Sequence, residues 1–115
     1  GNKQYQTWCI DNLARQIHPL TEANINKVWE LCSKIGQHNL ETCVMINAIS
    51  YYSVGDRPLG IDVCNTLTQA PRSQCLVPII NYLLGDNIGK DQKENLCRKI
   101  AGYDQSVCLE RLKQI

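Results

Sequence analysis

Three pairs of cysteines with identical internal spacing dominate this sequence. Ten residues separate the two members of each pair, and successive pairs begin 32 and then 33 residues apart. An aliphatic residue precedes the first cysteine of every pair, and another follows it by three positions. The pairs are Cys32 and Cys43, Cys64 and Cys75, and Cys97 and Cys108. Self-similarity at a fixed period is typical of stacked structural units, so the sequence predicts a row of similar building blocks.

The ten residues between paired cysteines form either a continuous helix or a turn between two helices. In a continuous helix both cysteines would share one face, about 16 Å apart, and each would bridge to a neighbouring helix. Every copy, however, contains Gly36, Pro71 or Gly102 at a similar place. Glycine costs about 1 kcal/mol and proline about 3 kcal/mol inside a helix. The pattern therefore favours a turn, which makes each unit a helical hairpin.

The residues around the breakers fit such a turn. Gly36 and Gly102 suit the left-handed position just after a helix ends. Asn39 and Asp104 suit the N-cap of the following helix, and Pro71 suits the first helical turn. The two cysteines of each pair would then lie on opposite sides of the turn within their hairpin.

Seven cysteines in 115 residues indicate an oxidising compartment, since such a density is unusual where thiols stay reduced. Zinc sites favour ligand pairs two to four residues apart, and none occurs here. We therefore expect disulfides. Two pairing schemes remain open, one within the constant interval and one between units. The first joins Cys32–Cys43, Cys64–Cys75 and Cys97–Cys108 and is favoured by its fixed geometry; the second joins Cys9–Cys32, Cys43–Cys64 and Cys75–Cys97.

The seventh cysteine, Cys9, lies where the second member of an earlier pair belongs, because Cys43 follows it by 34 residues. Its helix therefore looks like the trailing half of an earlier hairpin. Cys9 is either a buried, unpaired thiol in a capping helix, or it bonds to an upstream segment or to a second subunit as a disulfide-linked homodimer.

A chain of this length suits one domain with its own core. Helical spacing of apolar residues recurs, and no stretch alternates as a strand does, so we predict a single all-α domain, 1–115, of about seven helices. Its parts are an N-terminal half-unit at about 5–18 and hairpin units at about 21–52, 58–84 and 90–115. The first helix is expected at about 7–17, and the second begins after an N-cap at Thr21. The other five are expected at about 40–52, 59–68, 72–84, 91–101 and 104–115, with Pro78 kinking the fifth helix.

From Cys32 to Cys108 this layout resembles extracytoplasmic helical-repeat proteins of the Sel1-like, cysteine-rich kind. In those proteins each helical hairpin is closed by its own disulfide, which the resemblance implies here too. The small-residue and glycine signature of those repeats is absent, and the units are shorter. No functional residue carries over from the resemblance.

Several functions are disfavoured by composition and by missing motifs. Twelve basic and eleven acidic side chains with no long basic run give nucleic acid little to bind, and no apolar run approaches the length of a membrane span. His18 and His38 have no neighbouring serine or acid arranged as a nucleophile and base. The stretch around Asp86 lacks the alternating acids of a calcium loop. We expect no catalytic residue, metal or cofactor.

Aromatic residues give the best candidate for a binding surface. Tyr51 and Tyr52 end one predicted helix, Tyr82 falls at nearly the same place in the next unit, and Arg57 follows close by. Tyrosine is common in interfaces because its ring buries much area at low entropic cost. If the units stack, these side chains form a row at one end of the stack, near Arg57, and this row is the candidate binding surface. The plainer alternative, ordinary packing between units, remains open. Trp29, by contrast, lies in an apolar stripe and is expected in the core.

The sequence therefore predicts a secreted or periplasmic protein, from bacteria, that binds another protein as an envelope adaptor, an inhibitor or immunity protein, or a secreted effector. Rigid stacks offer binding surfaces without catalytic groups. The alternative is a carrier of a small apolar ligand or lipid. Its cavity would be lined by the apolar residues of the fifth helix, Ile79, Ile80, Leu83 and Leu84.

Overall fold

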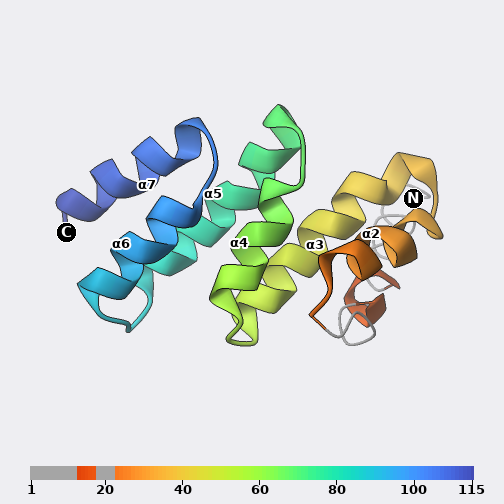
Figure 1. Ribbon diagram of the computed structural model, residues 1–115, viewed down its shortest axis with the longest axis horizontal. Coiled ribbons are helices and arrows are strands. Elements are labelled where there is room, and N and C mark those ends of the chain that lie inside the picture. The colour runs from red at the N-terminus through yellow and green to blue at the C-terminus, as the bar shows by residue number, and fades with distance from the viewer. Residues whose placement is uncertain (1–12, 18–22) are drawn as a thin grey trace, which may run out of the picture.

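The computed structural model describes residues 13–17 and 23–115, and this part of the chain is helical with no strand (Figure 1). Residues 13–17 are helical. They are followed by α2 (Ile25–Ser33), the 3₁₀ turn η2 (Gln37–Asn39), α3 (Leu40–Ser53), α4 (Arg57–Asn65), α5 (Gln69–Gly85), α6 (Lys90–Lys99) and α7 (Tyr103–Lys113). The predicted all-α fold is confirmed. Cys9, His18 and Thr21 lie outside the described residues.

Each of three helical hairpins is closed by a disulfide near its turn. The bond Cys32–Cys43 joins α2 to α3, Cys64–Cys75 joins α4 to α5, and Cys97–Cys108 joins α6 to α7. The Cα atoms of the bonded cysteines are 5.6, 5.6 and 5.5 Å apart, within the range that a disulfide requires. The pairs are those favoured by the constant interval, and bonding between units or to zinc is not seen for these six sulfurs.

Glycine permits two of the hairpin turns. Gly36 has φ 133° and Gly102 has φ 74°, which side-chain-bearing residues rarely adopt. The predicted left-handed helical conformation is nevertheless wrong, because ψ is 148° at Gly36 and −155° at Gly102. Both residues turn the chain from one helix directly into the start of the next. Pro71 lies in the first turn of α5, as predicted.

Two helices begin after N-caps other than Thr21 and Asp104, the residues that the sequence predicts for them. Asn24 caps α2, where its Oδ1 accepts a hydrogen bond from the backbone N–H of Lys27 at 3.2 Å. Asp104 is not the N-cap of α7 but its second residue, since Gly102 is the N-cap. The Asp104 carboxylate instead accepts a hydrogen bond of 2.6 Å from the hydroxyl of Ser73 on α5. Asn39 does precede α3, without a side-chain capping bond.

Both α4 and α5 begin two to three residues earlier than predicted, and α4 also ends earlier. The sequence predicts a helix only from about residue 59, but proline is tolerated in the first helical turn, and α4 begins at Arg57, before Pro58. Thr68, expected to end that helix, has the extended backbone of an N-cap, and α5 starts at Gln69. The helix then continues through Pro78 to Gly85.

The hairpins lie in a row, and hydrogen bonds join each to the next across about one unit of sequence (Figure 1). The indole Nε1 of Trp29 donates to Thr66 at 2.9 Å between the first and second hairpins. Between the second and third, Lys99 pairs with Asp62 at 3.0 Å, and Asn65 holds the turn after α6. Trp29, half-buried, therefore packs at the junction between hairpins rather than deep in the core.

A filled apolar core runs along the row. Its most buried large side chains are 0–1% exposed: Ile61, Leu76, Ile79, Ile80, Leu83 and Ile100. One polar residue lies among them, Asn47, whose amide nitrogen donates to the carbonyl oxygens of Ala14 at 3.1 Å and Cys43 at 2.8 Å. Asn47 thereby attaches the helical residues 13–17 to α3.

Candidate functional site

Four side chains from three helical segments meet where the second hairpin begins. The Tyr52 hydroxyl, at the end of α3, donates to Oδ2 of Asp86 at 2.7 Å, and Nε of Arg57 donates to the same oxygen at 3.1 Å. The Arg57 guanidinium lies 5.7 Å from the centre of the Tyr52 ring. The ring of Tyr82 stacks on Tyr52, with centroids 6.4 Å apart and planes 26° from parallel. We call these four residues the tyrosine cluster.

The charges of the tyrosine cluster support one another. Partial burial alone would raise the pKa of Asp86, but the hydrogen bonds from Tyr52 and Arg57 and the charge of Arg57 hold this pKa below its ordinary value. Burial, and then the hydrogen bond to the Asp86 carboxylate, raise the pKa of Tyr52. The cluster is therefore a fixed ion pair carrying a neutral phenol at neutral pH.

We expect the Asp86→Asn variant to lose stability relative to the parent above about pH 4 and to match it more closely in acid. A carboxylate whose pKa is lowered by folding adds stability above its unfolded pKa, and this stability is lost as pH falls through the folded pKa. Urea unfolding of both proteins between about pH 2 and 7 measures the difference. A difference that stays constant across this range would contradict an ionised, stabilising Asp86.

The structure separates Tyr51 from the tyrosine cluster. Tyr51 is 4% exposed, and burial first of all raises its pKa, while a hydrogen bond with the backbone of Ala23 acts in the opposite direction. Consecutive residues of a helix point in different directions, so Tyr51 and Tyr52 face different neighbours. The predicted row of tyrosines is thus incomplete: Tyr52 supports the surface from beneath, and Tyr82, 52% exposed, is the ring that meets solvent.

The sequence assigns Asp86 no role, since the stretch around it lacks the pattern of a calcium loop. Its actual position follows from Gly85, which ends α5 and leaves the next residue with an extended backbone beside Tyr52 and Arg57. Asp86 lies 34 residues after Tyr52 and 29 after Arg57 in the sequence. This separation of about one unit is the only sequence feature that could have indicated the contact. Among residues 13–17 and 23–115, no group of three histidine, cysteine or acidic side chains is placed to hold a metal ion.

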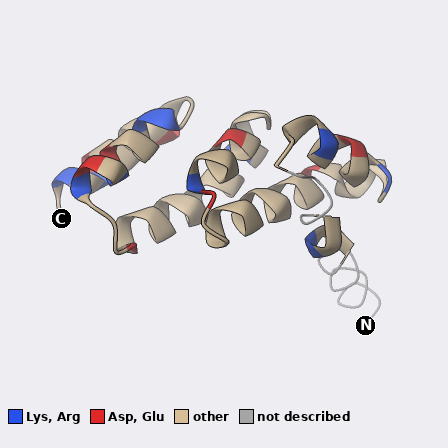
Figure 2. Cartoon of the chain, turned by 60° about the horizontal axis from the view of Figure 1, so that its bottom comes forward, with Lys and Arg blue, Asp and Glu red and all other residues tan. Residues whose placement is uncertain are grey.

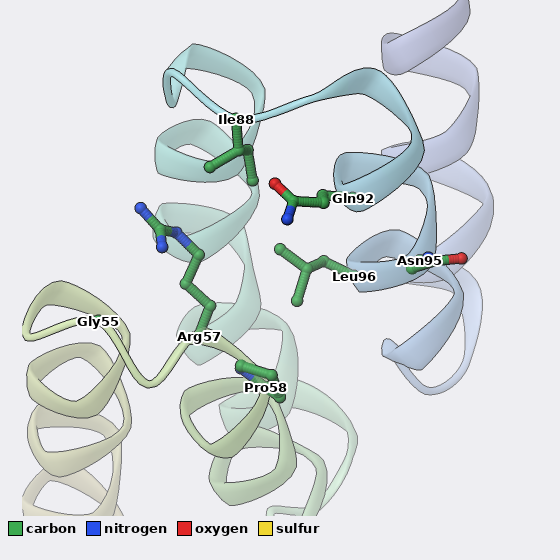
Figure 3. A pocket seen from close by; sticks show the side chains of 7 residues that line it. All are labelled: Gly55, Arg57, Pro58, Ile88, Gln92, Asn95 and Leu96. Carbon is green, nitrogen blue, oxygen red and sulfur yellow. The ribbon is translucent and has the colours of Figure 1, made fainter.

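A groove of about 280 Å³ lies next to the tyrosine cluster, between the start of α4 and the face of α6 (Figure 3). Pro58, Ile88 and Leu96 give it apolar walls, and Arg57 and Gln92 supply polar groups. Figure 3 shows Gln92 and Leu96 pointing from α6 into the space below Ile88, with Arg57 rising opposite them. This groove was not predictable from sequence patterns, because its walls come from two hairpins.

The outer side of α5, from which Tyr82 projects, is almost uncharged. Arg72 is its single charged residue among 17, whereas basic and acidic residues are interspersed along α6 (Figure 2). Val77 and Tyr82 on α5 are 48% and 52% exposed. An exposed aromatic ring on a surface poor in charge is typical of the centre of protein interfaces.

None of the described helices is both long and apolar enough to span a bilayer. Comparison of the chain with family models, with curated proteins and with solved structures finds no significant match. Its function is therefore to be inferred from its own residues.

Proposed function

We propose that this chain is an extracytoplasmic, disulfide-stabilised helical repeat protein that binds another protein. The roles it fits are an envelope adaptor, an inhibitor or immunity protein, or a secreted effector. The observation that carries the proposal is Tyr82: its ring is half exposed, on a nearly uncharged helix, and is stacked on a buried tyrosine.

Rigidity is what makes this surface suited to binding. Tyr82 rests on Tyr52, whose hydroxyl is bonded to Asp86, which in turn is bonded to Arg57. A ring already held in place loses little conformational freedom when a partner covers it, so more of its contact energy contributes to affinity. Anchors of this kind, tyrosine and arginine above all, account for most of the binding energy in protein interfaces.

The location outside the cytoplasm is supported by the three disulfides. Each joins buried cysteines within one hairpin, so they serve the fold rather than redox chemistry. Such structural bonds persist in secreted and periplasmic proteins and are rare where thiols are kept reduced.

Binding of a protein is better supported than carriage of an apolar ligand. Three side chains that were candidates to line a cavity, Ile79, Ile80 and Leu83, are 0–1% exposed and packed in the core. Leu84 is partly buried against the same core. These residues therefore contact one another and their neighbours.

We expect a photo-crosslinking amino acid at position 82 to capture a discrete partner protein when the chain is expressed in the extracytoplasmic space of its native host. The matched control is position 103, a tyrosine that is 81% exposed at the start of α7 and lies outside the tyrosine cluster. The Tyr82→Ala variant is expected to weaken binding of that partner about tenfold or more, and Tyr103→Ala to leave it unchanged. Equal capture at both positions, or capture of extracted lipid alone, would contradict the proposal.

A further inference from the structure

The groove beside the tyrosine cluster is braced from outside, so its shape does not depend on an occupant. Towards the opposite ends of α4 and α6, Lys99 is paired with Asp62 at 3.0 Å. Asn65 accepts from the backbone N–H of Ala101 at 3.1 Å and donates to the carbonyl of Lys99 at 2.9 Å. Both helices are therefore fixed at one end, and the groove opens at the other, where each helix begins.

The size of the groove suits side chains rather than a whole small molecule. Its volume of about 280 Å³ lies just below the range of about 300–1,000 Å³ typical of pockets for drug-sized ligands. Apolar walls formed by Pro58, Ile88 and Leu96 leave room for an apolar side chain inserted between α4 and α6. Gln92 points into the same space and offers one hydrogen-bond donor group and one acceptor, the pair that an extended peptide backbone requires (Figure 3).

The charge of the groove specifies the second feature of its occupant. Arg57 is charged and the other six lining residues are not, while its ion-pair partner Asp86 lies outside the lining, so the charged group that faces the groove is a guanidinium. Arg57 donates Nε–H to Asp86, and its guanidinium carries further N–H donors on the terminal nitrogens Nη1 and Nη2, which can serve a second acceptor. Asp86 and the Tyr52 ring fix the guanidinium, and a fixed guanidinium favours paired hydrogen bonds to a carboxylate.

The starts of α4 and α6 add to this preference. Their N-cap residues, Asp56 and Gly89, make no side-chain hydrogen bond to the helix, so backbone N–H groups at both starts lack that partner. Helix N-termini favour negative charge. Asp56 and Asp91 are exposed nearby without lining the groove, and they would repel a long acidic run, so one carboxylate fits better than several.

We propose that this groove binds an extended segment of the partner protein in which one acidic side chain stands next to one apolar side chain. The carboxylate pairs with Nη1 and Nη2 of Arg57, the apolar side chain fills the space between Pro58, Ile88 and Leu96, and Gln92 bonds to the peptide backbone. This inference rests on the proposed function and names the chemistry of the partner.

The test uses fluorescein-labelled octapeptides of glycine and serine with a central Glu-Leu pair, and matched peptides with Gln-Leu or Glu-Ser, in fluorescence polarisation with the full chain. We expect the Glu-Leu peptide to bind at least tenfold more tightly than either control, and its affinity to fall as salt is raised. Amide chemical shifts of Ile88, Gln92 and Leu96 should move on addition of this peptide. Equal affinity for all three peptides, or shifts elsewhere, would overturn the inference.

Two variants keep the test independent of folding. Gln92→Glu places a negative charge in the groove opposite Arg57 while leaving all four residues of the tyrosine cluster unchanged, and it is expected to abolish the preference for Glu-Leu. Gln74→Glu makes the same change at an exposed position of α5 that does not line the groove and is expected to leave it intact. Thermal unfolding of both variants establishes that they are folded. Capture of a partner at position 82 that is insensitive to Gln92→Glu would refute this inference while leaving the proposed function standing.

Discussion

Reduction of the three disulfides is expected to lower the melting temperature by tens of degrees. In the chain-entropy model, closing a loop of about a dozen residues contributes a little under 3 kcal/mol, and each bond here spans 11 residues. Three such bonds approach the whole net stability of an ordinary domain, about 5–15 kcal/mol. Circular dichroism melts with and without a strong reductant measure the shift.

The single-bond variant Cys97→Ala/Cys108→Ala is the matched control, because it opens the last hairpin and leaves two bonds intact. Its melting temperature should fall by roughly a third of the decrease seen on complete reduction. Faster amide hydrogen exchange should be confined to α6 and α7. A melting temperature that falls by only a few degrees on complete reduction would show that packing alone holds the hairpins together.

The second large effect is expected at Gly60, in the interior of α4. A methyl group in that position would lie 2.7 Å from the carbonyl oxygen of Ala48 and 2.9 Å from the backbone nitrogen of Tyr52. These are backbone atoms of α3, which do not rotate away as a flexible side chain does. Gly60→Ala should therefore destabilise the fold by about 2–3 kcal/mol, although alanine normally stabilises a helix interior by about 1 kcal/mol over glycine.

Gly85 at the end of α5 provides the control for Gly60. A methyl group there meets no atom within 4 Å, so Gly85→Ala should be neutral or slightly stabilising. Urea unfolding of both variants compares the two free energies. An unchanged or increased stability of Gly60→Ala would mean that α3 and α4 are not in the close contact described above. The variant also displaces Tyr52, so the fluorescence or ring resonances of the tyrosine cluster should change with it.

The cysteine spacing and the three breakers were sufficient to predict the hairpins, because both features act within a dozen residues. Residue preferences also placed Gly36 at a turn and Pro71 in the first turn of a helix. They did not predict the ψ angle of Gly36 or the residue at which α5 begins, because the same residues are compatible with several backbone conformations there. Asp104 shows the same limit: its N-cap chemistry was plausible, yet a hydroxyl from another hairpin, that of Ser73, is its partner.

The candidate site was predictable only in part for a related reason. Tyr52, Arg57 and Tyr82 were selected by residue type and by their place in the unit, whereas Asp86 and the groove depend on how one hairpin lies against the next. Nothing in a single sequence fixes that distance or angle. Tyr51 illustrates the converse, since a helix turns by about 100° at each residue, and only the packing of α3 decides which of two adjacent tyrosines faces the cluster.

All three disulfides connect cysteines that are neighbours along this part of the chain. A chain that enters an oxidising compartment from its N-terminal side can therefore seal each hairpin as soon as its second thiol emerges, without waiting for residues still to come. With sequential closure of this kind, Cys9 is the one earlier thiol that competes for Cys32, and each later hairpin meets only bonds that are already closed. Such a molecule has little need of an isomerase to reshuffle these bonds, and its maturation is set by the pace of delivery rather than by searching among alternative pairings.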